Sequence, residues 1–237
     1  MKEDKAMKKL AIITARGGSK RIPRKNIREF AGKPIIMYSI EAALQSGVFD
    51  EVMVSTDDEE IARIAIASGA VVPFYRSAET SNDYASTADV IREVLKEYEK
   101  RGKSFDQLCC IYPTAPFITA RRLTEAMKCL EEKQADCVMP VLRFSFPPQR
   151  GVIIQDGMLN AKWPEHMNSR SQDLEPIYHD AGQFYCLNRK QFQLQNKIIM
   201  ERTYPIILSE MEVQDIDTKE DWQLAEQKYL FGKSHLG

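Results

Sequence analysis

The sequence predicts an α/β fold of Rossmann-like type, with a mostly parallel sheet and helices on both of its faces. Over roughly the first 140 residues, short apolar runs alternate with segments of helical periodicity. These runs are nearly continuous in apolar character, which is typical of parallel strands that are buried on both faces. We therefore expect one domain over residues 1–237, with an inserted segment at 143–180.

The expected elements follow one another in regular order up to the insertion. Apolar runs predict strands at 10–14, 51–56, 70–75, 107–112 and 136–142. Pro73 places the third of these at an edge of the sheet, or shortens it. Helical spacing, acidic starts and closing glycines predict helices at 34–47, 57–69, 86–102 and 120–133. The helix at 86–102 begins with a capping box of Ser86 and Asp89.

Beyond the insertion, the strand pattern returns and a helix closes the chain. Apolar runs predict strands at 183–188, 205–209 and 212–216. The last helix begins at a capping box formed by Thr218 and Asp221. It carries Trp222, Ala225 and Tyr229 on one face, which predicts that this face packs against the domain.

The inserted segment 143–180 has a different composition. It contains four prolines and two turn-prone glycines among short apolar pieces, a pattern that predicts a β-hairpin arm. Its large apolar side chains expose more surface than a lone hairpin can cover. They are Phe144, Phe146, Trp163 and Met167.

Composition and charge argue against several classes of protein. The formal net charge of −1 gives no general attraction to nucleic acid or to an anionic membrane. No apolar stretch approaches the roughly 20 residues of a membrane span. Five cysteines without C-x-x-C spacing favour reduced, buried thiols in the cytoplasm over disulfides or zinc. Residues 1–6 are polar and expected to fray, with Met7 as an alternative start.

The loop after the first strand gathers cations and glycines where open α/β sheets bind ligands. Two glycines let backbone N–H groups approach an anion, and arginine can hold a phosphate through two hydrogen bonds. Walker A and G-x-G-x-x-G patterns are absent. A solvated basic loop is the alternative, but the glycine pair, the cations and the position after the first strand together favour a polyphosphate site. The residues are Ala15, Arg16, Gly17, Gly18, Ser19, Lys20, Arg21, Lys25 and Asn26.

Two aspartates, Asp215 and Asp217, stand at the end of the strand expected at 212–216. Strand alternation sends both carboxylates to the same side, where they can share a hard divalent cation. The alternative is that Asp217 and Thr218 only form a loop and the start of a helix.

Five segments together resemble the CMP-sialic acid synthetase family over nearly the whole chain. They are "ARGGSKRIPRKN", "DEVMVSTDDEEIA", "ETSNDYASTADVI", "CCIYPTAPF" and "EVQDIDTKEDW". A sixth, "QDLEPIYHDAGQFY", is similar to the pseudaminic acid branch, whereas neuraminate-specific members more often have N-G-A-I-Y near "DAGQFY". The resemblance implies the nucleotide-diphospho-sugar transferase fold. It also implies a reaction of CTP with a nine-carbon α-keto acid sugar, which yields CMP-sugar and pyrophosphate.

The resemblance also implies roles for individual residues. Asp215 and Asp217 would bind Mg²⁺ at the α-phosphate and, with Arg16 and Lys25, form the catalytic group. Further contacts to the nucleotide would come from Arg76, Ser86, Thr87, Pro113 and Thr114. Contacts to the sugar would come from Arg170, Gln172, Asp173, His179 and Gln183, with Arg143 as another partner for its carboxylate. Turn, cap and structural roles are the alternatives for Ser86, Thr87, Thr114 and His179.

Several alternatives to this function stay open at the level of sequence. The same reaction could use N-acetylneuraminic, legionaminic or 3-deoxy-octulosonic acid. A nucleotide-sugar-binding protein without turnover is a second possibility. A nucleic-acid-binding module built on the basic loop is a third, and the net charge argues against it. The family's arm reaches over a second subunit, so a homodimer is expected, with neither nucleic acid nor membrane as partner.

Overall fold

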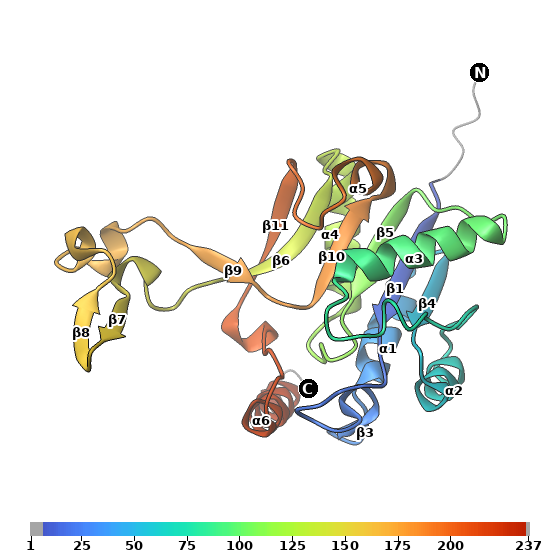
Figure 1. Cartoon of the computed structure of the whole chain (residues 1–237), viewed down its shortest axis with the longest axis horizontal. Coiled ribbons are helices and arrows are strands. Elements are labelled where there is room, and N and C mark those ends of the chain that lie inside the picture. Colours follow the sequence, from blue (N-terminus) through green and yellow to red (C-terminus); the bar gives the residue numbers. More distant parts are fainter. Residues whose placement is uncertain (1–6, 236–237) are drawn as a thin grey trace.

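One central sheet organises the part of the chain that the computed structural model describes, residues 7–235; the expectation for residues 1–6 lies outside it. Its seven strands run in the order β11-β6-β10-β5-β1-β4, with β9 paired to β6 (Figure 1). Parallel ladders join β1 to β4 and β5, and β11 to β6. The antiparallel members are β9 and β10. The mostly parallel sheet is thus confirmed. The strands are β1 (Lys9–Thr14), β4 (Glu51–Ser55), β5 (Gln107–Ile111), β6 (Cys137–Arg143), β9 (Tyr178–Asp180), β10 (Phe184–Asn188) and β11 (Thr203–Leu208).

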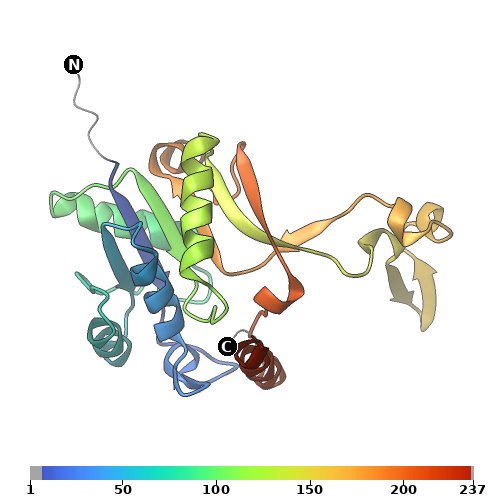
Figure 2. The same cartoon turned by 180° about the vertical axis from the view of Figure 1, so that it is seen from behind.

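Helices cover both faces of this sheet, as predicted (Figures 1 and 2). On β1, Ala11 and Ile13 face a core shared with α1 and α4, whereas Leu10 and Ile12 face a core shared with α3 and α5. Each face therefore has its own apolar core, which is why the strands are apolar throughout. The helices are α1 (Ile36–Ser46), α2 (Glu59–Ala67), α3 (Thr87–Lys100), α4 (Ala120–Glu132), α5 (Arg189–Gln195) and α6 (Lys219–His235).

The last helix, α6, packs at the edge of the domain against the start of the chain. Trp222 and Ala225 are buried there with Ile22 and Phe30, and Tyr229 packs against the same cluster. The helix begins as predicted, because Asp221 accepts hydrogen bonds from the backbone and hydroxyl of Thr218 and donates its own N–H back. The predicted capping box at Ser86 and Asp89 is also present.

Two predicted strands were wrong. The segment 70–75 contributes only an isolated bridge between Val71 and Met53, because Pro73 has no N–H with which to extend a ladder. The segment 212–216 forms no strand; a 3₁₀ turn, η5 (Glu210–Glu212), follows β11, and residues 213–217 join no ladder. Three short elements were not predicted: α5 and the paired strands β2 (Glu29–Phe30) and β3 (Lys33–Pro34). The pairing of β9 with β6 was not expected either.

The inserted segment forms an arm that extends away from the sheet (Figures 1 and 2). Its predicted hairpin is confirmed as β7 (Val152–Gln155) and β8 (Met158–Ala161). Asp156 and Gly157 both have positive φ, which suits a tight turn between two twisted strands. Ile154, Met158 and Leu159 are exposed on it. The arm also holds the 3₁₀ turns η2 (Pro148–Arg150), η3 (Pro164–His166) and η4 (Ser171–Asp173).

The cysteines are free thiols, and Cys109, Cys110, Cys137 and Cys186 are buried in the sheet, as expected. Burial raises the pKa of Cys110 to about 12, so this thiol is protonated and unreactive. Among residues 7–235, no helix is long and apolar enough to cross a membrane.

Candidate active site

The basic loop lies at the carboxyl end of β1, and acidic residues before α2 fix its path. The N–H of Gly17 donates to Asp57 Oδ1 at 2.8 Å. Asn26, predicted as a nucleotide contact, is buried and donates from Nδ2 to the carbonyl of Arg16 at 2.8 Å. This bond ties the two ends of the loop together. The loop is therefore a built structure rather than a freely solvated turn.

Arg24 anchors the loop to the start of α2 and does not line the pocket of the loop. It has a left-handed backbone, with φ of 55°, and its guanidinium pairs with Asp58 and Glu60. Hydrogen bonds from Arg24 hold the pKa of Asp58 below its usual range. Sequence analysis missed these acidic partners, although the acidic run at 57–60 was a visible signal.

The loop encloses a pocket of about 530 Å³, which brings together most of the residues predicted to bind a nucleotide. A smaller cavity of about 170 Å³ shares Thr14, Arg16 and Asp83 with it and adds Arg76 and Thr87. Ala15 is buried behind the pocket, and Ser86 serves as the N-cap of α3. The larger pocket is lined by Thr14, Arg16, Ser19, Lys20, Arg21, Lys25, Asn26, Asp83, Tyr112, Pro113 and Thr114.

Asp83, which sequence analysis missed, faces the loop cations across this pocket. Its carboxylate accepts from Arg16 Nη1 at 2.7 Å and pairs with Lys20 Nζ. These hydrogen bonds, the one from Lys20 first, hold the pKa of Asp83 below its usual range. In this structure, Asp83 therefore takes the place of an anionic ligand beside the two cations.

Arg76 is a buried cation at the wall of the smaller cavity. Its Nε donates to Ser55 Oγ at 3.0 Å and its Nη2 to the carbonyl of Ser55 at 2.7 Å. Burial lowers its pKa, and no carboxylate forms an ion pair with it among the described residues. Its guanidinium is thus anchored to β4 while the cavity beside it offers room for a polar ligand.

The structure brings Asp217 to the basic loop, whereas Asp215 lines the neighbouring pocket that contains His179. Lys25 Nζ donates to the carbonyl of Ile216 at 2.7 Å and lies 3.5 Å from Asp217 Oδ1. Arg21 Nη1 lies 2.9 Å from Asp217 Oδ2. Ile216 is buried between the aspartates, so Asp215 and Asp217 flank an inward-pointing residue even without a strand. Residues about 190 positions apart in sequence therefore share one site.

The donor set fits a magnesium ion that also binds phosphate. Carboxylate oxygens are the ligands that hard divalent cations prefer. Within the described part of the chain, no group of three or more His, Cys, Asp or Glu side chains could hold a metal by itself. Asp215 and Asp217 therefore suit an ion that takes its remaining ligands from a substrate and from water, as Mg²⁺ commonly does.

The residues predicted to bind a sugar are divided between three places. A pocket of about 430 Å³ next to Asp215 contains His179 and Arg143. Arg170, Gln172 and Asp173 lie within the inserted segment, as predicted, where Arg170 Nε lies 2.7 Å from Asp173 Oδ2. They line neither of these two pockets, and their role as sugar contacts stays a prediction.

Gln183, also predicted as a sugar contact, is buried in the structure, with 4% of its surface exposed. Its Nε2 donates to the backbone carbonyl of Glu212 at 2.5 Å. Its own backbone carbonyl accepts from the N–H of Tyr112 at 2.8 Å. Gln183 therefore connects the residue after β5 to the 209–217 segment, and its role as a sugar contact stays a prediction.

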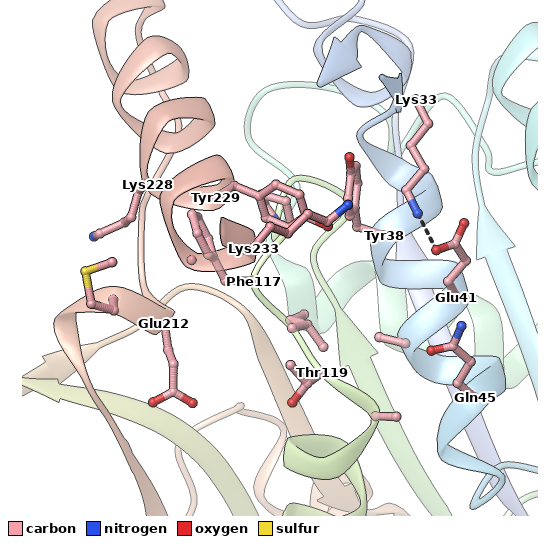
Figure 3. A pocket seen from close by; sticks show the side chains of 16 residues that line it. Lys33, Tyr38, Glu41, Gln45, Phe117, Thr119, Glu212, Lys228, Tyr229 and Lys233 are labelled. Atoms are coloured by element: carbon pink, nitrogen blue, oxygen red, sulfur yellow. Dashed lines mark hydrogen bonds and ion pairs between the residues drawn. The ribbon is translucent and has the colours of Figure 1, made fainter. Parts of the chain in front are cut away.

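A third large cavity, of about 570 Å³, lies between α1 and α6 (Figure 3). Tyr38, Phe117 and Tyr229 give it an aromatic wall, and Glu212 and Lys228 lie on the side nearest η5. It shares no residue with the pocket around the basic loop. No residue of the predicted site lies in it.

Fold and pocket together define an α/β protein with a cation-rich pocket at the carboxyl end of β1, the edge where open α/β sheets bind their ligands. More specifically, the chain belongs to the cytidylyltransferase family, whose family model matches residues 10–227.

Curated relatives resemble the chain over its full length. It is 42% identical to the pseudaminic acid cytidylyltransferase of Campylobacter jejuni, covering 97% of this chain and 98% of that one. It is 35% identical to the CMP-N,N'-diacetyllegionaminic acid synthase of Legionella pneumophila, covering 93% and 95%. The fold matches that of a CMP:2-keto-3-deoxy-manno-octonic acid synthetase complexed with CTP, with a TM-score of 0.68, 20% identity and coverage of 96% and 99%.

Proposed function

We propose that this protein transfers a cytidylyl group from CTP to a nine-carbon α-keto acid sugar, with pseudaminic acid as the favoured acceptor. The products would be the CMP-sugar and pyrophosphate. The observation that carries the proposal is the contact of Lys25 and Arg21 with Asp217, because it joins the loop that we propose binds polyphosphate to a carboxylate that we propose binds the metal. The full-length identity to a pseudaminic acid cytidylyltransferase supports the choice of acceptor.

The reaction is an in-line displacement at the α-phosphorus of CTP. The anomeric oxygen of the sugar forms a new bond to phosphorus while the bond to the pyrophosphate oxygen breaks, and the hydroxyl proton leaves to solvent. Arg16, Lys20, Arg21 and Lys25 would stabilise the negative charge that builds on the leaving pyrophosphate. Backbone N–H groups of the glycine-containing loop would share this task.

Asp215 and Asp217 would hold Mg²⁺, which when bound supplies charge to polarise an α-phosphate oxygen. Lys25 would keep the Asp217 carboxylate oriented and the neighbouring backbone in place through its bond to Ile216. Before this, the triphosphate would displace Asp83 from Arg16 and Lys20, since all three groups meet at the same pocket. We place the reaction in the cytoplasm, where free thiols such as those of this sheet persist.

We further propose that the protein acts as a homodimer in which the arm reaches a second subunit. The exposed apolar side chains of the hairpin support this, as does the position of Arg170, Gln172 and Asp173 away from their own chain's pockets. Sedimentation equilibrium should give about twice the chain mass of 27.2 kDa. A monomer at micromolar concentration would refute the arm's role.

Pyrophosphate release tests the proposed function. The protein is incubated with CTP, Mg²⁺ and, separately, pseudaminic, N-acetylneuraminic, N,N'-diacetyllegionaminic and 3-deoxy-octulosonic acids. We expect turnover with pseudaminic acid first, and a loss of at least about 100-fold in Asp215→Asn and Asp217→Asn, or about 3 kcal/mol of transition-state stabilisation. Asp156→Asn, on the arm turn, is the matched control.

Three outcomes of this assay are informative. Turnover that is greatest with another sugar would change the acceptor and keep the reaction. CTP binding without pyrophosphate release would show a binding protein instead of an enzyme. Near-normal turnover in both aspartate variants would refute the metal assignment.

A further inference from the structure

The segment 209–217, which carries both aspartates, belongs to no sheet. It leaves β11 after Leu208, makes the turn η5 and runs without a ladder to the start of α6. A strand holds its residues through backbone bonds on both sides. This segment lacks such bonds, so its position depends on side chains from other elements.

Arg122 on α4 provides a two-point contact to this segment. Its Nε donates to Glu212 Oε1 at 2.8 Å and its Nη2 to Oε2 at 3.0 Å. The same carboxylate accepts from the N–H of Ser209 at 3.1 Å and from its hydroxyl at 2.9 Å. Gln183 adds a bond to the Glu212 carbonyl at 2.5 Å. Glu212 is therefore fixed to α4, to the residue that precedes β10 and to its own turn.

Downstream of Glu212, the chain is held at two further points. Lys228 on α6 donates to the carbonyl of Val213 at 2.7 Å, and Lys25 donates to that of Ile216 at 2.7 Å. Only two residues separate Glu212 from Asp215, a span of roughly 10 Å at full extension. Arg122 thus fixes the upstream end of this short stretch, and Lys228 and Lys25 hold it further along.

The pair of Arg122 and Glu212 is mostly shielded from solvent. Their side chains are 16% and 28% exposed, less than in most surface ion pairs. Burial raises the pKa of Glu212, but hydrogen bonds from Arg122 and Ser209 outweigh it and bring the pKa down to about 2. Both Arg122 and Glu212 are consequently charged throughout the neutral pH range.

The pair lies away from the reacting groups. Glu212 lines the cavity between α1 and α6, on the same side as Lys228 (Figure 3). Arg122 lines neither the pocket of the basic loop nor the pocket of His179 and Asp215. Neither residue is thus placed to touch a nucleotide or a sugar.

We propose that Arg122 is a positioning residue, whose two-point ion pair with Glu212 places Asp215 and Asp217 where they meet the metal and the α-phosphate. This inference deepens the proposed function and rests on it for the metal. The positioning itself is a property of the free protein and is testable without turnover.

The test compares Arg122→Gln with Arg121→Gln, its neighbour on α4. Arg121 carries the same charge, but its side chain is 71% exposed and its Nη2 lies 4.0 Å from Glu212. Glu212→Gln removes the other partner, and the double variant Arg122→Glu with Glu212→Arg restores a pair with reversed charges. Arg122→Lys keeps the charge and loses the planar fork.

Three measurements follow each variant. Hydrogen exchange with mass spectrometry reports on the peptide that covers 209–217 in the free protein. Electron paramagnetic resonance of free Mn²⁺ gives metal affinity in the presence of α,β-methylene-CTP. Pyrophosphate release at varied Mg²⁺ gives the concentration for half-maximal rate and the KM for CTP at saturating Mg²⁺.

We expect Arg122→Gln to accelerate exchange in 209–217 and to leave exchange in the central strands unchanged. Mn²⁺ affinity should fall and the half-maximal Mg²⁺ concentration rise by about 10-fold, since the segment is no longer fixed. The KM for CTP at saturating Mg²⁺ should stay within about 2-fold, because the basic loop is intact. The charge-reversed double variant should recover part of the metal affinity, as coupled residues do.

Equal exchange and equal metal requirement in Arg122→Gln and Arg121→Gln would overturn the proposal. If Arg122→Gln does not fold, Arg122→Lys decides: an intermediate shift supports positioning, and wild-type values refute it. If the wild-type protein shows no turnover at all, the proposed function fails, and exchange in 209–217 still decides whether Arg122 positions this segment.

Discussion

A methyl group at residue 17 should damage both the basic loop and the helix beneath it. A Cβ on Gly17 would lie 2.8 Å from Asp58 Oδ2, closer than such atoms approach, and 3.0 Å from Asp58 Cβ, which is a very tight contact. Asp58 cannot simply rotate away. It caps α2 by accepting from the N–H groups of Glu60 at 2.9 Å and Ile61 at 3.0 Å, and it pairs with Arg24.

The size of the effect follows from these contacts. If the Asp58 side chain moves, Gly17→Ala loses the N-cap of α2, which lowers the free energy of unfolding by about 0.5–2 kcal/mol. If the loop backbone moves instead, overpacking lowers it by about 1–3 kcal/mol, and the bond from the Gly17 N–H to Asp57 weakens. We therefore expect the free energy of unfolding to fall by about 2 kcal/mol, together with weaker binding of CTP.

Gly18→Ala is the matched control, because a Cβ there would meet nothing within 4 Å. Its unfolding free energy should stay within about 0.5 kcal/mol of wild type. Urea unfolding measures the stability of both variants, and titration calorimetry measures their affinity for CTP. Indistinguishable values for the two alanine variants would show that Asp58 relaxes freely and does not hold the loop in place.

Three further predictions concern charged groups of the site. Asp83→Asn should lower the KM for CTP several-fold in steady-state assays, because a competing carboxylate leaves Arg16 and Lys20; a raised KM would mean that Asp83 binds the substrate complex itself. Lys25→Ala should reduce kcat/KM for CTP by at least about 10-fold, or ~1.4 kcal/mol, and an unchanged value would contradict its bridging role. Glu212 has a pKa lowered to about 2 from the usual 4.5, so its contribution to the free energy of unfolding is present above pH 4.5 and is lost as the pH falls toward 2. Across that pH range, urea unfolding should show the free energy of unfolding of wild type falling by up to about 3 kcal/mol relative to that of Glu212→Gln. A difference between the two proteins that does not change with pH would refute the pairing.

The parallel core of the fold was predictable because its cause is local. Strands covered on both faces must be apolar at every position, and β1 and β5 show this directly in their letters. The segment 212–216 misled the same reasoning, since its two buried residues pack in different places without joining the sheet. Val213 packs into the core on the α1 and α4 face of the sheet, and Ile216 packs against α6 and residues 22–38.

The cations of the candidate site were predictable, and their anionic partners were not. Glycine, arginine and lysine cluster within one loop, so their chemistry is visible in a short window. Asp57 and Asp83 act on that loop from 40 and 67 residues away, and only the fold reveals the contact. Arg170 differs, because the composition of segment 143–180 already predicts that it lies on an arm.

The bond from Lys25 to Ile216 joins positions 191 residues apart, near opposite ends of the sequence. During synthesis, the basic loop leaves the ribosome long before Asp215 and Asp217 are made. The nascent chain can pair β1 with β4 and β5 before then. The contacts of Lys25 and Arg21 with residues 216 and 217 can form only once that segment has been made, so the two halves of the candidate site come together late.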